Sequence, residues 1–436
     1  MPRPSSGNGS SALLHDVRPQ VGRAGAADEL DGAVREVRPG APMMSEPAET
    51  LEELRRAGLY RELRVIESAQ GPRVVLGGRE VLLLCSNDYL GFAGHPALRD
   101  AAADAAERWG AGAGASRLVS GNMALHEELE EELAEFKGYR RCVLFGSGFL
   151  ANTGVISALT GPQDAILSDA LNHASIIDGC RLSRAETIVY GHADLDALEH
   201  GLRRASGRRA LIVTDAVFSM DGDLAPLEGI VELAQRYAAC VLVDEAHATG
   251  VVGPGGRGLV AALGLEREVD VVIGTLSKAL GSYGAFVCGA PTTAEFLVNR
   301  ARTLIYSTAL PPPTVGAALA GLRLLRDRPS AVERLWSNAR LLRAELAASG
   351  FEMAQGEMPI VPVVLGDPQI TLRVAEQALR DGVFAQAIRP PTVPAGTSRL
   401  RLVATAAHSE QELRRAARTI AAAHARSARL RVSVSH

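Results

Sequence analysis

Lysine is almost missing from this chain of 436 residues, in which lysine and arginine together number 46. Only Lys137 and Lys278 are lysines, so chemistry that needs a primary amine has two candidates. Lys137 stands directly before Gly138 at the end of an expected helix, where a cation is favourable. We therefore expect a structural role for Lys137, which leaves Lys278 as the candidate for chemistry.

Other absences exclude further classes of protein. No run of about 18 apolar residues occurs, so we expect no membrane-spanning helix. The net charge of −4 gives no electrostatic reason to expect nucleic acid or an anionic membrane as a partner. The five cysteines are odd in number and widely separated, which favours reduced thiols in the cytoplasm over a disulfide framework or a metal site.

One motif, 244–247 (DEAH), is shared with helicase-type NTPases. Such enzymes also need a glycine-lysine pair in a Walker A loop. Phe136 precedes Lys137 and Ser277 precedes Lys278, so neither lysine can serve in that loop. The NTPase interpretation is therefore excluded.

The order of apolar segments predicts an α/β fold. Short β-branched runs that are apolar on both faces alternate with helical stretches from about 140 to 290, as in a buried and mainly parallel sheet. The expected strands are 142–145, 165–167, 187–190, 211–214, 241–243, 271–274 and 285–288. Beyond them we expect helices over 313–348 and 371–380 and strands at 361–365, 383–388 and 399–403.

These patterns predict a large domain and a smaller α+β domain built from both ends of the chain. Residues 1–45 are rich in Pro, Gly, Ser and Ala and are expected to be a disordered tail. A capping-box pattern at Thr50 predicts the start of a helix that stops near Gly58. We expect residues 46–90 to join the small domain, 91–312 to form the large domain, and 313–430 to form the connecting helices and the rest of the small domain.

An acid and a lysine follow two of the expected strands. Asp244 comes after one strand and Lys278 after another, at the sheet edge where α/β folds bind ligands. This pair suits pyridoxal 5′-phosphate (PLP), because a carboxylate can keep the pyridine nitrogen protonated and a buried neutral lysine can hold the aldehyde as a Schiff base. Gly148 and Phe149 lie between an expected strand and a further helix expected to begin near Leu150, and small residues at such a helix start leave N–H groups free for a phosphate.

Several motifs in order resemble the α-oxoamine synthases, a family of PLP enzymes with the aspartate aminotransferase fold (fold type I). The resemblance covers about 50–425 and rests on 86–91 (SNDYLG), 244–247 (DEAH) with the later Gly250, 275–278 (TLSK) and 306–312 (YSTALPP). It implies a large mainly parallel-sheet domain, a smaller α+β domain, and a homodimer with shared active sites. The alternative is a PLP-dependent aminotransferase or decarboxylase that needs no thioester. Only these motifs favour the α-oxoamine synthases over that alternative.

The resemblance also implies residue roles. Lys278 matches the Schiff-base lysine and α-proton base, and Asp244 matches the partner of the pyridine nitrogen. The other catalytic and cofactor-binding positions that it implies are His173 on the ring face, His247 and Ser219 beside the phenolic oxygen, Gly148, Phe149 and Thr275 near the cofactor, and Thr308 from the partner subunit. The implied substrate-binding positions are Arg61 and Thr392 for the acyl chain, Asn87, Ser116, and Arg401 for the amino-acid carboxylate.

The segment 389–397 (RPPTVPAGT) looks most like family members that condense L-alanine with a pimeloyl thioester, losing CO2, to make 8-amino-7-oxononanoate for biotin. Ser116, where glycine-specific relatives often have threonine, supports alanine. Met358 departs from the small residue expected nearby. Glycine or serine as the amino acid, or another acyl-CoA, stays open, as in 5-aminolevulinate synthase, glycine C-acetyltransferase and serine palmitoyltransferase. Coenzyme A or an acyl carrier protein can deliver the acyl group.

Overall fold

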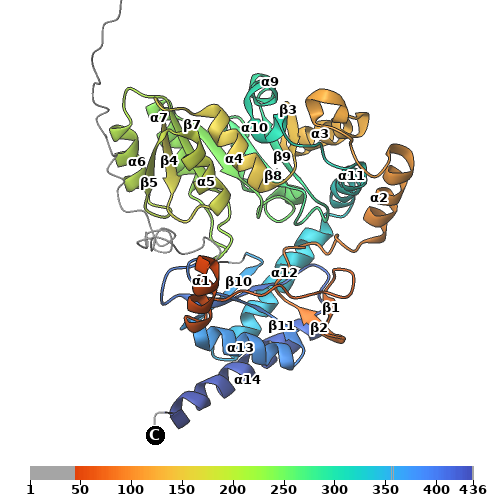
Figure 1. Cartoon of the computed structure of the whole chain (residues 1–436), viewed down its shortest axis with the longest axis vertical. Helices are drawn as coiled ribbons and strands as arrows, with labels where there is room; N and C mark the ends of the chain where they lie inside the picture. Colours follow the sequence, from red (N-terminus) through yellow and green to blue (C-terminus); the bar gives the residue numbers. More distant parts are fainter. Residues whose placement is uncertain (1–44, 355, 357, 435–436) are drawn as a thin grey trace, which may run out of the picture.

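A computed structural model describes residues 45–354, 356 and 358–434, so the expected tail lies outside the described residues except for its last one. Figure 1 shows a large upper lobe and a smaller lower lobe. The large lobe holds a seven-stranded sheet in the order β3-β9-β8-β7-β6-β4-β5. The strands are β3 (Arg141–Phe145), β4 (Ala165–Asp169), β5 (Glu186–Tyr190), β6 (Ala210–Asp215), β7 (Cys240–Asp244), β8 (Val271–Thr275) and β9 (Ala285–Gly289).

This sheet confirms the expected α/β fold. Each of the seven expected strands is present, and β9 alone runs antiparallel to its neighbours. Val241 and Val243 pack into one apolar core, whereas Leu242 packs into another. Successive strand residues point to opposite faces, so the sheet is covered by apolar packing on both sides. The parallel strands β7 and β8 therefore end together at one edge.

Helices surround the sheet of the large lobe (Figure 1). They are α2 (Pro96–Trp109), α3 (Ala124–Lys137), α4 (Gly148–Leu159), α5 (Ala174–Ser183), α6 (Leu195–Arg204), α7 (Leu227–Tyr237), α8 (Leu259–Leu263), α9 (Pro291–Arg300), α10 (Arg302–Ile305) and α11 (Pro312–Asp327), with the short η1 (Arg117–Gly121) and η2 (Pro254–Gly256). No helix in the described ranges is long and apolar enough to cross a membrane.

The small lobe combines both ends of the described chain. It has the antiparallel sheet β10-β13-β12 and a second sheet, β1-β2-β11. Its strands are β1 (Arg73–Leu76), β2 (Arg79–Leu83), β10 (Ile360–Gly366), β11 (Val383–Phe384), β12 (Gln386–Ile388) and β13 (Ser398–Val403), and its helices are α1 (Ser45–Arg56), α13 (Pro368–Arg380) and α14 (Glu410–Val434). The predicted domain boundaries themselves stay predictions.

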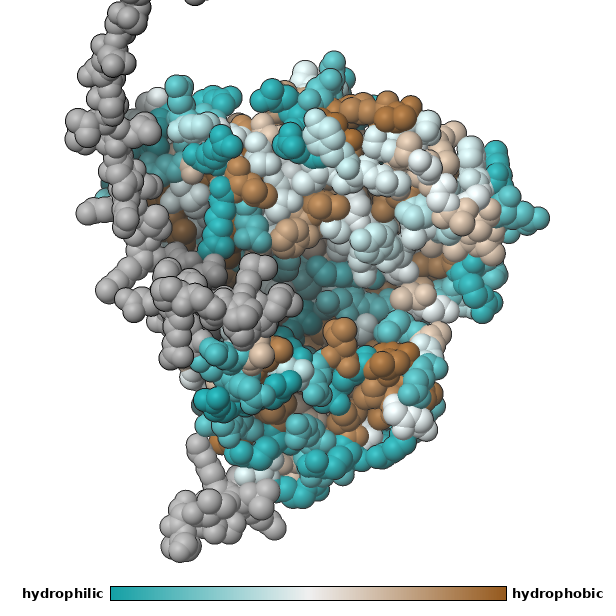
Figure 2. All heavy atoms as spheres, viewed as in Figure 1, coloured by the Kyte–Doolittle hydropathy of each residue, from teal (hydrophilic) through white to brown (hydrophobic). Residues whose placement is uncertain are grey.

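The helix α12 (Ser330–Ala348) connects the lobes. Its Ala331 and Leu335 belong to the core of the large lobe, whereas Leu342 and Leu346 belong to the core of the small lobe. One continuous helix thus fixes the two lobes relative to each other (Figure 1). Between them the surface is hollowed and largely hydrophilic in Figure 2.

Two local predictions were wrong. Thr50 does not cap a helix, because α1 begins at Ser45 and Thr50 lies inside it. The single strand expected at 383–388 is two strands, since β11 pairs with β2 while β12 pairs with β13. The alternation of side chains is continuous through Ala385, so only the choice of partner strands divides this segment.

Candidate functional site at the ends of three strands

Three acidic or basic residues meet where neighbouring parallel strands end. Asp215 ends β6 and Asp244 ends β7, and the two are opposite each other in the register of these strands. Thr275 ends β8, and Lys278 follows three residues later. Lys278 interacts electrostatically with both carboxylates. The predicted pair of Asp244 and Lys278 is therefore assembled at one edge of the sheet, although Asp215 was not part of the prediction.

Asp244 is held by two hydrogen bonds. Asn152 of α4 donates from Nδ2 to Oδ2 over 2.6 Å, and the backbone N–H of Ala246 donates to Oδ1 over 2.8 Å. Asn152 is almost completely buried and its Nδ2 also donates to the Ser175 hydroxyl. Both oxygens of Asp244 are thus satisfied while the carboxyl group stays buried, which fixes its direction.

Lys278 lies in surroundings that favour its neutral form. Burial lowers the pKa of its amine, and the nearby Arg401 lowers it further, whereas Asp244 and Asp215 raise it. The net direction is downward because the loss of water costs the charged form most. A neutral amine is the form that can attack an aldehyde or take a proton.

His173 is the N-cap of α5, and its exposed side chain bonds to Ser175. Its Nδ1 lies 2.7 Å from the Ser175 hydroxyl, and its backbone N–H donates to Asp215 Oδ2 over 2.7 Å. Partial loss of water around the ring lowers the pKa of His173, Asp244 raises it, and Lys278 lowers it. His173 is therefore brought to the same cluster as the predicted lysine and acid.

His247 is buried and is bound by a tyrosine. Its Nδ1 lies 2.6 Å from the hydroxyl of Tyr89, which comes from the segment before α2. Burial, Lys278 and Arg401 hold the pKa of His247 well below its usual range. The ring is therefore neutral, and Tyr89 fixes how it is turned.

Arg401 reaches the site from β13 of the small lobe. Its Nε donates to the carbonyl oxygen of Ser219, and its Nη1 donates to Asn87 Oδ1 over 3.0 Å. Its Nη2 is buried and has no partner among the described residues. A buried guanidinium with an unsatisfied donor suits a carboxylate ligand, because the cost of burial is then offset.

The β3–α4 turn provides a place for an anion. Ser147 caps α4 by accepting the backbone N–H of Leu150, so the first N–H groups of the helix, at Gly148 and Phe149, point outward. An added Cβ at Gly148 would meet nothing within 4 Å, so space is open there. The residues present therefore fit PLP: the start of α4 suits its phosphate, Asp244 its pyridine nitrogen and Lys278 its aldehyde.

The remaining predicted positions form two pairs. Arg61 Nη2 lies 3.4 Å from the Thr392 hydroxyl, which joins the two expected acyl-binding residues. Ser116 and Thr308 form a bridge between backbone segments. No hydrogen bond in the described part of the chain links either pair to Lys278. Phe149 is 45% exposed, so it is open to contact with another molecule.

Met358 and Lys137 are structural. Met358, which stands where a small residue was expected, is buried in the core of the large lobe. Lys137 ends α3 before a left-handed Gly138, as expected. Its amine, however, is buried against Glu245 instead of standing at an exposed helix end. Both lysines of the chain therefore have buried surroundings, but Lys137 has a carboxylate partner of its own.

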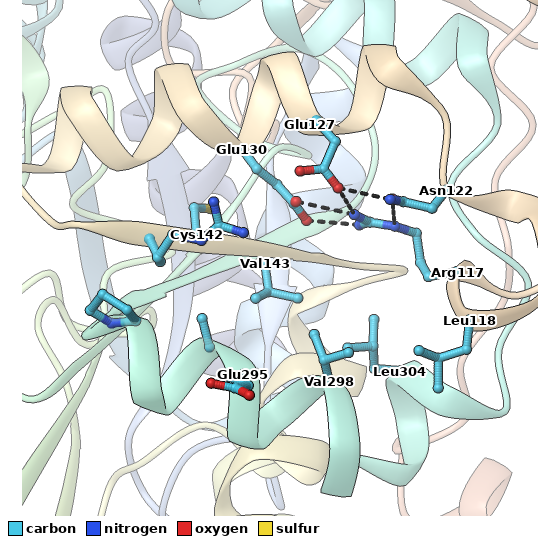
Figure 3. A pocket seen from close by; sticks show the side chains of 13 residues that line it. Arg117, Leu118, Asn122, Glu127, Glu130, Cys142, Val143, Glu295, Val298 and Leu304 are labelled. Atoms are coloured by element: carbon cyan, nitrogen blue, oxygen red, sulfur yellow. Dashed lines mark hydrogen bonds and ion pairs between the residues drawn. The ribbon is translucent and has the colours of Figure 1, made fainter.

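A hollow of about 470 Å³ lies apart from this site, between η1, α3 and α9. Figure 3 shows Arg117 at one side of it, bound to Glu130, Glu127 and Asn122. Arg117 Nη1 lies 2.7 Å from Glu130 Oε1. None of Asp215, Asp244 and Lys278 lines this hollow.

Asn152, Asp215 and Tyr89 also contact the site, although none of them was predicted as a site residue from the sequence. Asp215 carries the same signal as Asp244, an acid directly after a buried strand, and could have been found by it. Tyr89 lies inside the 86–91 motif. Asn152 had only the weak signal of an amide within an apolar helix.

Known proteins match this chain over most of its length. The aminotransferase class I and II family matches residues 79–420. The chain belongs to this family. It is 51% identical to the 8-amino-7-oxononanoate synthase of Citrifermentans bemidjiense over 374 residues, which cover 85% of this chain and 96% of that protein. It is 53% identical to the synthase of the same name from Anaeromyxobacter dehalogenans, covering 83% and 91%.

Among solved structures, the family is represented by a serine palmitoyltransferase variant from S. paucimobilis, solved with bound PLP and myriocin. It has a TM-score of 0.85 and 34% identity, and the match covers 89% of this chain and all of that one. These findings confirm the resemblance to the α-oxoamine synthases and the fold type I architecture.

Proposed function

We propose that this enzyme condenses L-alanine with a pimeloyl thioester, with loss of CO2, to form 8-amino-7-oxononanoate and a free thiol in biotin biosynthesis. The carrying observation is the convergence of Lys278, Asp244 and the unpartnered Nη2 of Arg401 on one site. Relatives about half identical to this chain bear the name of that synthase. The enzyme is then an acyltransferase that uses PLP.

When bound, PLP supplies an electron sink for the α-carbon of an amino acid. We propose that Lys278 holds its aldehyde end and Asp244 its pyridine nitrogen. His173 would then cover the ring face, and His247 and Ser219 would lie beside the phenolic oxygen. The α4 start at Gly148 and Phe149, with Thr275, would bind the phosphate. The satisfied hydrogen bonds around Asp244 support this assignment, since they hold the carboxylate in one direction.

The protein's own groups then bind the amino acid and move its proton. Arg401 Nη2 takes the carboxylate, which orients the bonds at the α-carbon. Lys278 Nζ accepts the α-proton, which the lowered pKa of its amine favours. Asn87 holds the other side of the Arg401 guanidinium. Ser116 leaves room for the methyl group of alanine, and Arg61 with Thr392 binds the acyl chain.

We also propose a cytoplasmic homodimer in which Thr308 serves the partner's site. Tyr306 and Val119, close in sequence to Thr308 and Ser116, are 72% and 78% exposed. Large apolar side chains at the surface favour contact with a partner. The five cysteines are all unpaired, as suits a reducing compartment. Light scattering of the PLP-loaded enzyme measures the assembly, and a monomer would contradict this part.

Thiol release tests the activity. Pimeloyl-CoA is supplied with L-alanine, glycine or L-serine, and free thiol is measured alongside the mass of the product. The proposal predicts release with alanine and a product of the mass of 8-amino-7-oxononanoate. Release with glycine or serine alone would assign the enzyme to another branch of the family. Pimeloyl-carrier protein in place of pimeloyl-CoA identifies the donor.

A further inference from the structure

A loop of the large lobe is clamped by the small lobe beside the site. Residues 219–222, which follow β6, contact strands β10 and β13 at three points. Arg399 forms an ion pair with Asp221, and Arg401 donates to the carbonyl of Ser219. Gly222, at a φ of 74°, packs so closely on Ile360 that an added Cβ would lie 2.9 Å from its carbonyl oxygen.

The two arginines reach this loop from the same side of one strand. Arg399 and Arg401 are two residues apart on β13, and in the register with β10 they stand opposite Val364 and Pro362. Side chains two apart on a strand point the same way. The loop is therefore a common support for both guanidinium groups.

Arg399 is a buried charge with a single carboxylate partner among the described residues. Its side chain is 5% exposed, whereas that of Asp221 is 41% exposed. Its Nε also donates to the Thr397 carbonyl over 2.9 Å, which holds the side chain along its own strand. A buried guanidinium binds its carboxylate strongly, because releasing it would leave an unpaired charge without water.

We propose that the Arg399–Asp221 ion pair is a positioning pair that sets Arg401 for the carboxylate of the amino-acid substrate. Asp221 holds the loop against β13, and the loop in turn presents the Ser219 carbonyl to Arg401 Nε. With Nε and Nη1 both bound, Nη2 is the donor left for a ligand. The inference rests on the proposed function, since it assigns that donor to an amino acid.

The test separates the amino acid from the acyl donor. Asp221→Asn keeps the size of the side chain and removes its charge, and Arg399→Gln removes the other partner. We expect the KM for L-alanine to rise by about tenfold to 100-fold, since a displaced guanidinium loses its alignment with the carboxylate. The KM for pimeloyl-CoA should stay within about twofold of the wild-type value, because Arg61 and Thr392, the proposed acyl-binding residues, contact each other and not this ion pair.

Two controls separate positioning from general stability. Arg73→Gln removes two ion pairs of the small lobe, with Glu80 and Glu412, neither of which touches the loop 219–222. It should leave both KM values unchanged. Asp221→Glu keeps the negative charge, so its KM for alanine should lie between those of the wild type and Asp221→Asn. Equal rises in both KM values, or no rise in either, would overturn the proposal, as would an effect of Arg73→Gln as large as that of Asp221→Asn.

Binding of the amino acid gives a readout that needs no acyl transfer. The visible absorbance of the PLP-loaded enzyme is titrated with alanine, glycine and serine, for the wild type and Asp221→Asn. The proposal predicts a weaker Kd in the variant for whichever amino acid the wild type binds. If the wild type binds an amino acid but releases no thiol, the proposed activity fails while this comparison still decides the role of the ion pair. An unchanged Kd would contradict it.

Discussion

Asp215 and Asp244 stand opposite each other at the ends of the paired strands β6 and β7. Burial and the neighbouring Asp244 raise the pKa of Asp215 well above its usual range. Two adjacent buried carboxylates cannot both carry a full charge cheaply, and the raised pKa of Asp215 favours a proton on that side of the pair. The carboxyl group of Asp244 has Asn152 and a backbone N–H as hydrogen-bond donors.

Amide replacements should distinguish these two acids. Asp215→Asn keeps an oxygen for the backbone N–H of His173 and should change kcat by less than about tenfold, because the raised pKa of Asp215 favours its neutral form. Asp244→Asn should lower kcat by about 100-fold or more, because the charged partner of the cofactor is lost. Steady-state thiol release measures both. An Asp215→Asn variant as inactive as Asp244→Asn would show that Asp215 acts as an anion.

Asn152 should matter for the cofactor more than for the fold. Asn152→Ala removes the donor to Asp244 Oδ2 and should weaken PLP binding by about tenfold to 100-fold, as hydrogen bonds to charged groups do. Titration of the apoenzyme with PLP, followed by visible absorbance, gives the Kd. Ser157→Ala is the matched control, because Ser157 lies on the same helix and bonds only to backbone oxygens. Equal Kd values for the two variants would refute the role of Asn152.

Tyr89 should act through His247. Tyr89→Phe keeps the buried ring but leaves His247 Nδ1 without its hydroxyl partner, so kcat should fall by about tenfold, the effect of losing one buried hydrogen bond. Tyr139→Phe is the control, since the Tyr139 hydroxyl bonds to the Val269 carbonyl away from the site. If both variants keep wild-type kcat, His247 does not depend on Tyr89 for its orientation.

His192 should make stability depend on pH on the alkaline side. It lies 3.0 Å from Asp169 and also bonds to Asp223, and these two carboxylates raise its pKa to about 10 against burial, which lowers it. The stabilisation is complete below the ordinary pKa of 6.5 and is lost as pH rises through about 10. Urea unfolding of the wild type and His192→Gln should differ most near pH 6 and least above pH 10, as estimated by linkage. A difference that grows with pH would contradict the ion pair.

The sequence predicted the parts of the fold that depend on local pattern. All seven strands of the large sheet are apolar runs, and burial on both faces is what such runs require. The hairpin of β1 and β2 was missed, although Gly77 and Gly78 form its two-residue turn. The split between β11 and β12 had no local signal, because it depends on which strands lie beside Ala385.

Part of the candidate site could be predicted from the sequence. An acid and a lysine at strand ends indicate a site by themselves, and the structure places Asp244 and Lys278 together. Asn152 and Tyr89 could not be predicted in this way, because each acts by contacting another side chain that is distant in sequence. The Arg399–Asp221 ion pair joins residues 178 positions apart, so only the fold reveals it.

The role of Lys278 is directly testable, because the chain has so few lysines. The PLP-loaded enzyme is reduced with borohydride, digested, and mapped by mass spectrometry, with Lys278→Ala treated in parallel. Because the chain has only two lysines, each can be followed on its own peptide. We expect a pyridoxyl mass on Lys278, none on Lys137, and no label or visible absorbance in the variant. A label on Lys137, or a variant that stays yellow after reduction and dialysis, would contradict it.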